Sequence, residues 1–169
     1  NKGPLILLSR SHYGFVKRLL EIEVPELNDG TIMLYSVARD AGSRTKIAVY
    51  TEYNNVDPIG AVIGEKGRRI SAVLKELGGE KIDVILYDKD PVKFIANALS
   101  PAKDVKVTIK DENKKEALAL ANDSNLSLAI GKKGQNVKLA SRLTHYKIEV
   151  KSESAQEENK EEISLVEEE

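Results

Sequence analysis

Ala61-Val-Ile-Gly-Glu-Lys-Gly-Arg-Arg-Ile70 and Leu128-Ala-Ile-Gly-Lys-Lys-Gly-Gln-Asn-Val137 share one pattern. Each stretch has aliphatic residues, a glycine, two charged residues, a second glycine and then the start of an amphipathic helix. Gly64 and Gly131 lie 67 residues apart. That period is too long for the unit of a solenoid, so it indicates two copies of one small domain.

The residues around each Gly-x-x-Gly stretch predict the same order of elements, α-β-β-α-α-β, in both copies. Pro, Gly and Asp mark the ends of these elements, and Asp57, Asp90 and Pro91 are typical of helix starts. The first predicted helix has Phe15, Leu19 and Ile22 on one face and ends near Val24-Pro25. In the first copy, strands are expected at 32–38, 45–50 and 82–87, and helices at 57–63 and 68–77. In the second copy, strands are expected at 105–109, 117–121 and 146–150, and helices at 90–99, 125–130 and 135–143. The fold class is therefore α+β, with a three-stranded sheet in each copy.

The repeated loop has the features of a phosphate-binding site. It leads into a helix, whose first N–H groups and positive dipole end favour an anion. Glycine has no Cβ, so a ligand backbone can approach it closely. Lysines and arginines add positive charge, and neighbouring aliphatic side chains could form an apolar floor for bases. The candidate nucleic-acid-binding residues are Val62, Ile63, Gly64, Glu65, Lys66, Gly67, Arg68, Arg69, Ile130, Gly131, Lys132, Lys133, Gly134, Gln135 and Lys138.

The two loops differ in charge. Lys132 and Lys133 give the second loop two cations, whereas Glu65 and Lys66 give the first loop none net. We therefore expect the second loop to contribute more to the binding of a phosphate backbone. We also expect aspartate in place of Gly64 or Gly131 to weaken that binding with little change in the fold.

Composition excludes several classes of protein. The 169 residues contain no cysteine, which rules out disulfides and zinc-thiolate sites. The apolar run near the start, residues 5–8, is far too short to span a bilayer. Residues 152–169 hold eight glutamates and one lysine, whereas the whole chain has a net charge of −1, so the rest of the chain has a net positive charge. A basic body and an acidic tail are typical of nucleic-acid binders, and so polar a tail is expected to be disordered and solvated.

In these motifs the sequence resembles the prokaryotic-type (type II) KH domain, and the pair resembles the tandem KH domains of the NusA family of transcription termination/antitermination proteins. The resemblance covers roughly residues 4–150. It implies domains at 11–88 and 89–151, and a remnant of an OB-type RNA-binding barrel at 1–10. The segments that carry it are Arg44-Thr-Lys-Ile-Ala-Val-Tyr50, Asn55-Val-Asp-Pro58, Gly79-Glu-Lys-Ile-Asp83, Ala96-Asn-Ala-Leu-Ser-Pro-Ala102 and Leu126-Ser-Leu-Ala-Ile-Gly131, with Leu5-Ile-Leu-Leu-Ser-Arg10 for the barrel.

The resemblance implies a cytoplasmic protein that binds single-stranded RNA, the nascent transcript, and acts in transcriptional pausing, termination and antitermination. KH domains hold about four nucleotides against the Gly-x-x-Gly loop. RNA polymerase and other antitermination factors are implied as partners of a full-length family member. We expect a monomer with no membrane attachment, no cofactor and no metal site.

An enzyme is not expected. His12 and His145 are the only imidazoles and both fall at predicted helix ends, where a capping or solvated histidine is usual. Asp57, Asp83 and Asp90 fit helix caps and strand ends better than a metal site. The alternative function is a protein-interaction scaffold whose KH units no longer bind RNA. The negative charge of Glu65 in the first loop is the reason to consider it.

Overall fold

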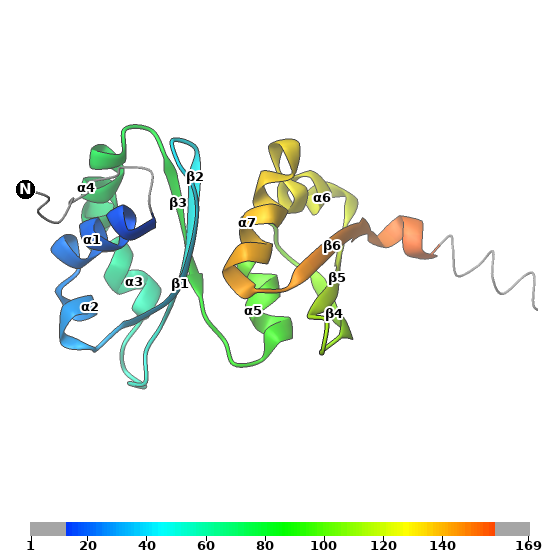
Figure 1. Ribbon diagram of the computed structural model, residues 1–169, viewed down its shortest axis with the longest axis horizontal. Coiled ribbons are helices and arrows are strands. Elements are labelled where there is room, and N and C mark those ends of the chain that lie inside the picture. The colour runs from blue at the N-terminus through cyan, green and yellow to red at the C-terminus, as the bar shows by residue number, and fades with distance from the viewer. Residues whose placement is uncertain (1–12, 158–169) are drawn as a thin grey trace, which may run out of the picture. The chain divides into compact units, whose positions relative to one another are not determined.

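The structure of the protein is a computed structural model that describes residues 13–157 (Figure 1). The chain separates into two units, Asn1–Val84 and Ile85–Glu169, and each unit has its own sheet and helices. The predicted barrel remnant at 1–10, together with Ser11 and His12, lies outside the described residues. Two three-stranded sheets and their helices confirm the predicted α+β class.

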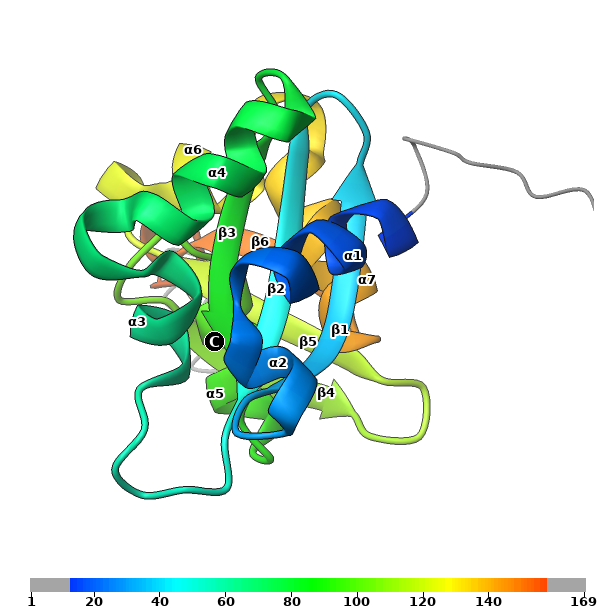
Figure 2. The same ribbon diagram turned by 90° about the vertical axis from the view of Figure 1, so that its left-hand side faces the viewer.

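The first unit places its helices on one face of a three-stranded sheet (Figure 2). Strand order is β1-β2-β3, with β1 and β2 antiparallel. Its elements are α1 (Tyr13–Glu23), α2 (Pro25–Asp29), β1 (Met33–Asp40), β2 (Arg44–Tyr50), α3 (Pro58–Ile63), a 3-10 turn (Glu65–Gly67), α4 (Arg68–Leu77) and β3 (Lys81–Leu86).

The second unit repeats this arrangement. Its strand order is β4-β5-β6, in which β4 and β5 are antiparallel and β5 and β6 are parallel. Its elements are α5 (Pro91–Ala98), β4 (Lys106–Asp111), β5 (Glu116–Ala121), α6 (Asp123–Ile130), a 3-10 turn (Lys132–Gly134), α7 (Gln135–Thr144) and β6 (Lys147–Ser152).

Side-chain caps fix where the helices before each loop begin. The Asp57 carboxylate accepts a hydrogen bond from the Gly60 N–H at 3.1 Å, and Asn122 Oδ1 accepts one from the Asn125 N–H at 3.0 Å. Asp90 caps α5 in the same way, with Pro91 at the first helical position. These caps satisfy N–H groups that would otherwise lack a partner. The capping expected of Asp57 and Asp90 is therefore confirmed, and α3 and α6 end at the two glycine loops.

The apolar face predicted for the first helix is partly wrong. Val16 and Leu20 of α1 are fully buried in the first core, whereas Ile22 is 63% exposed. Phe15 and Leu19 pack at the edge of that core. Residues 15, 19 and 22 share one helical face, but the sheet covers the adjacent face, which carries Val16 and Leu20.

Two further segments contain structure that the sequence did not predict. The first helix ends at Glu23, which confirms the predicted end near Val24-Pro25, but Pro25 then begins an unexpected short helix, α2. At the other end, Ser152 is the last residue of β6 and residues 153–157 are helical, so the acidic segment expected to be disordered begins with regular structure. The remaining part of the predicted tail, 158–169, lies outside the described residues.

A buried carboxylate, Glu80, ties the first hairpin to the start of β3. It accepts hydrogen bonds from the Arg39 guanidinium, the Thr45 hydroxyl at 2.6 Å and the Gly42 N–H at 2.9 Å. Burial disfavours the carboxylate of Glu80, but these donors outweigh burial and hold its pKa below the ordinary value. The contacts around Glu80 therefore stabilise the charged form.

The lowered pKa of Glu80 predicts acid sensitivity. Because the pKa is lower in the folded than in the unfolded state, this stabilisation is present above the unfolded pKa and is lost as pH falls through the folded one. We expect Glu80→Gln to lower the free energy of unfolding at pH 7 by about 3 kcal/mol. The difference from the wild type should shrink towards pH 3, as measured by urea unfolding. Parallel pH profiles of the two proteins would contradict this account.

Candidate nucleic-acid interface

The two glycine loops have the same backbone conformation. The first glycine has φ/ψ of 78/170° at Gly64 and 77/168° at Gly131. Lys66 and Lys133, which directly precede the second glycine of their loops, are left-handed, with φ of 55° and 56°. Each loop therefore presents its charged pair and its second glycine in an equivalent way, and the predicted repeat extends to individual dihedral angles.

The first glycine of each loop is required by packing within the protein. A Cβ at Gly131 would lie 2.7 Å from the Asn136 nitrogen and 2.8 Å from its Cβ. A Cβ at Gly64 would lie 2.7 Å from Cγ of Arg69. The loop folds back on the first turn of the following helix, so the expectation that aspartate at Gly64 or Gly131 leaves the fold unchanged is wrong.

The second glycine of each loop faces open space. A Cβ at Gly134 would meet nothing closer than 3.8 Å, and one at Gly67 nothing closer than 3.9 Å. Both glycines are left-handed and directly precede the ten-residue helices α4 and α7, which no side chain within the described residues caps. This is the place where a ligand phosphate could approach the helix N-terminus most closely.

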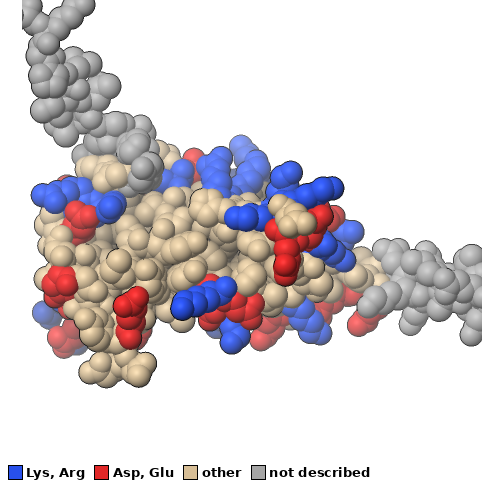
Figure 3. Space-filling model, turned by 60° about the horizontal axis from the view of Figure 1, so that its bottom comes forward, with Lys and Arg blue, Asp and Glu red and all other residues tan. Residues whose placement is uncertain are grey.

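The cations divide unequally between the loops. Lys132 and Lys133 of the second loop and Lys138 of α7 are all exposed, and no ion pair formed among residues 13–157 includes them. At the first loop, Lys66 and the first residue of α4, Arg68, are exposed beside the exposed Glu65. Figure 3 shows one face of the molecule, on which basic side chains form groups and acidic ones lie among them. The second loop offers the stronger positive site.

Arg69 is held inside the first unit. Its Nη1 lies 2.8 Å from the Glu26 carboxylate of α2 and donates to the carbonyl of Ala61 at 2.9 Å. Arg69, a predicted nucleic-acid-binding cation, is therefore already paired with a carboxylate of its own unit. A hollow of about 480 Å³ beside this loop is lined by both signs of charge: Glu26, Gly60, Ala61, Gly64, Glu65, Arg68 and Arg69.

The apolar residues near the loops are only partly available to bases. Val62 is fully buried in the first core, so its assignment to a base-contacting floor is wrong. Ile63 and Ile130 are half-buried next to their loops. Leu128 on α6 is 46% exposed and was not among the predicted site residues. Its position in the repeated phrase, three residues before Gly131, is the signal that could have identified it.

Asn136 is the second residue that sequence reasoning missed. It occupies in α7 the position that Arg69 has in α4, and it is almost completely buried. Its Nδ2 donates to the carbonyls of Leu99 and Ala129, at 3.0 Å and 2.9 Å. Asn136 therefore fastens the end of α6, and with it the second loop, to the C-terminal end of α5.

Arg68 and Arg69 are expected to behave differently when neutralised. Arg68→Gln should weaken RNA binding about 3-fold and make the salt dependence shallower by about 0.7, because it removes one exposed cation. Arg69→Gln should leave the salt dependence unchanged and lower stability by at most about 1 kcal/mol, since the pair with Glu26 is partly exposed. Fluorescence anisotropy titrations at several salt concentrations measure both slopes. A shallower slope for Arg69→Gln would show that this side chain leaves Glu26 for the ligand.

The described residues hold no group of three or more His, Cys, Asp or Glu side chains placed to bind a metal ion. None of the helices between residues 13 and 157 has the length and apolar character needed to cross a membrane.

Comparison with known proteins finds two family matches, one on each unit. Residues 10–87 match the NusA-like first KH domain, and residues 91–158 match the NusA-like second KH domain. A solved structure described as the crystal structure of APE1850 is similar in fold, with a TM-score of 0.56 and 22% identity. That match covers 80% of this chain and 96% of the other.

Curated relatives share about half of their aligned residues with this chain. The transcription termination/antitermination protein NusA of Halalkalibacterium halodurans is 54% identical over 157 residues, which is 93% of this chain and 41% of that protein. The NusA proteins of Bacillus subtilis and Thermus thermophilus are 54% and 51% identical over 90% and 87% of this chain, which spans 41% and 38% of their lengths. The chain belongs to the NusA family, and its two units are the first and second KH domains of that family.

Proposed function

We propose that this chain binds single-stranded RNA through its two glycine loops. The observation that carries the proposal is the matched geometry of the loops, each of which leads into a ten-residue helix that no described side chain caps, with exposed cations beside it. Such a helix start favours a phosphate, and the absence of a Cβ at Gly67 and Gly134 lets the ligand backbone come close.

The relatives support a role for this binding in transcription. They carry the name transcription termination/antitermination protein, and the chain spans about two fifths of their length. We infer that the RNA is the nascent transcript, read during pausing, termination and antitermination in the bacterial cytoplasm. RNA polymerase and other antitermination factors would be partners of the longer protein. We propose that the chain is a monomeric binding protein without enzymatic activity.

The alternative, a protein-interaction scaffold, has support in the first unit alone. There Glu65 lies in the loop, and Glu26 neutralises Arg69 at 2.8 Å. Neither feature occurs at the second loop, where Lys132, Lys133 and the nearby Lys138 of α7 form no ion pair among the described residues. RNA binding is therefore the function that the two sites together support best, with the second unit contributing more.

A titration with RNA tests this function. We expect eight-nucleotide single-stranded RNA to bind more tightly than a duplex of the same sequence, since KH domains hold about four unpaired nucleotides. If one unit engages about four phosphates, the plot of log K against log salt should have a slope of roughly −3. Fluorescence anisotropy from 50 to 300 mM salt measures both quantities. A slope near zero, or equal affinity for the duplex, would favour the scaffold.

A further inference from the structure

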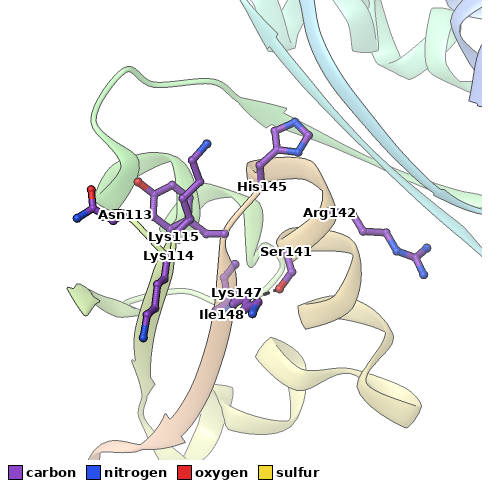
Figure 4. Close-up of a pocket in the computed structure, with 9 residues that line it drawn as sticks. Asn113, Lys114, Lys115, Ser141, Arg142, His145, Lys147 and Ile148 are labelled. Atoms are coloured by element: carbon purple, nitrogen blue, oxygen red, sulfur yellow. Dashed lines mark hydrogen bonds between the residues drawn. The ribbon is translucent and has the colours of Figure 1, made fainter. Parts of the chain in front are cut away.

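The second unit has a basic hollow at the end of α7 that is remote from the glycine loop (Figure 4). Its volume is about 550 Å³, and it is open to solvent. Lys114, Lys115, Arg142, His145 and Lys147 line it together with Tyr146, and no acidic side chain of residues 13–157 does. We call it the α7 basic hollow.

Three elements build the α7 basic hollow. The turn between β4 and β5 supplies Lys114 and Lys115, the last turn of α7 supplies Arg142, and the start of β6 supplies Lys147 (Figure 4). The Lys147 N–H donates to the Lys115 carbonyl at 2.8 Å, which fastens the hairpin turn to β6. The cations therefore stand on a fixed backbone frame.

The cations of the hollow have acidic neighbours in the chain, Asp111, Glu112 and Glu116, but none of these three lines the hollow. The ion pairs found among residues 13–157 include none of its lysines and neither Arg142 nor His145. Arg142 lies in the last turn of α7, where the helix dipole favours a cation. The three lysines have no such partner, and like charges gathered on one surface repel one another.

The corresponding place in the first unit shows that the fold does not need these charges. There the Lys81 N–H donates to the Ser43 carbonyl at 2.9 Å, as Lys147 does to Lys115. Gly78 ends α4 in the left-handed conformation that His145 has after α7. The residue before Lys81 is the buried Glu80, which accepts a hydrogen bond from the Gly42 N–H. At this place the first unit thus has a buried carboxylate bonded to the hairpin turn, whereas the second unit has a solvent-open hollow lined by cations.

We propose that the α7 basic hollow binds phosphates of the RNA strand held by the second glycine loop. This inference rests on the proposed function. The ten residues of α7 separate the loop from the hollow by about 15 Å, which a few nucleotides of an extended strand can span. Once the loop holds the strand, its next phosphates reach the hollow at high effective concentration. Tyr146 supplies an aromatic surface among the cations, a combination typical of sites for single-stranded nucleic acid.

RNAs of two lengths distinguish binding at the hollow from binding at the loop. We compare the wild type with the variant Lys114→Glu/Lys147→Glu on single-stranded RNAs of 5 and 15 nucleotides. The variant should bind the 15-mer roughly 10-fold more weakly, with a salt slope shallower by about 1.4, because two phosphate contacts are lost. Its affinity for the 5-mer should stay within about 2-fold, since so short a strand is held by the loop. Lys81→Glu, which changes the matching lysine of the first unit, should alter neither affinity.

Unchanged 15-mer affinity in a variant that is folded by circular dichroism would overturn the inference; a hollow that takes an acidic protein segment would give this result. If Lys114→Glu/Lys147→Glu does not fold, Arg142→Gln should show the same length-dependent loss. Failure of the proposed function is recognised separately. In that case Lys132→Glu/Lys133→Glu would leave the binding of both RNAs intact, or the wild type would bind neither.

Discussion

Reversing the charge of both lysines in the second loop, Lys132→Glu/Lys133→Glu, is expected to weaken single-stranded RNA binding by about 100-fold at 100 mM salt. The change removes two phosphate contacts and places two negative charges beside the start of α7. Lys133 is left-handed, with φ of 56°. Glutamate at that position meets a backbone strain similar to that of lysine, so the loop should keep its conformation.

Two control variants test whether the effect of this charge reversal is specific to the second loop. Lys103→Glu/Lys110→Glu changes the net charge equally at two exposed positions of the second unit and should reduce affinity by less than about 3-fold at that salt concentration, where screening is strong. Lys66→Glu in the first loop should also have a smaller effect, because Glu65 already offsets that lysine. Affinity of the Lys132→Glu/Lys133→Glu variant within 3-fold of the wild type would remove the second loop from the RNA site.

Helix boundaries and loops were predictable because their signals are local. Asp57 and Asp90 cap helices through N–H groups two or three residues away, and the glycines that flank each loop have positive φ values. A cap or a left-handed glycine depends on its immediate neighbours, so the sequence alone located α3, α5 and both loops within a few residues.

The roles of single side chains at the loops were less predictable because they depend on distant residues. Arg69 is paired with Glu26, which lies 43 residues earlier in the chain. Val62 is buried by residues of α1, β2 and α4. The α7 basic hollow joins a hairpin turn, a helix end and a strand start, so no single stretch of sequence contains it. Hydrophobic periodicity could not choose between two adjacent faces of α1, because the spacing fits both.

The largest loss of stability is expected from Gly131→Ala, which should lower the free energy of unfolding by about 3 to 4 kcal/mol. The glycine has φ/ψ of 77/168°, a region that is essentially restricted to glycine. An added Cβ would also lie 2.7 Å from the backbone nitrogen of Asn136, so the first turn of α7 must shift. Urea unfolding followed by circular dichroism measures this loss.

Gly134→Ala is the comparison within the same loop, because Gly134 has φ/ψ of 73/14°, a left-handed conformation that other residues can adopt at a modest cost, and an added Cβ there makes no close contact. It should lower stability by only about 1 kcal/mol. Because its new methyl group points into the open space where a phosphate would approach, it should nevertheless weaken RNA binding by about 10-fold, which is about 1.4 kcal/mol. The two glycines of one loop would then separate into one that the fold requires and one that the ligand requires. Equal losses of stability in the two variants would show that neither the contact with Asn136 nor the glycine-only conformation of Gly131 makes that glycine necessary.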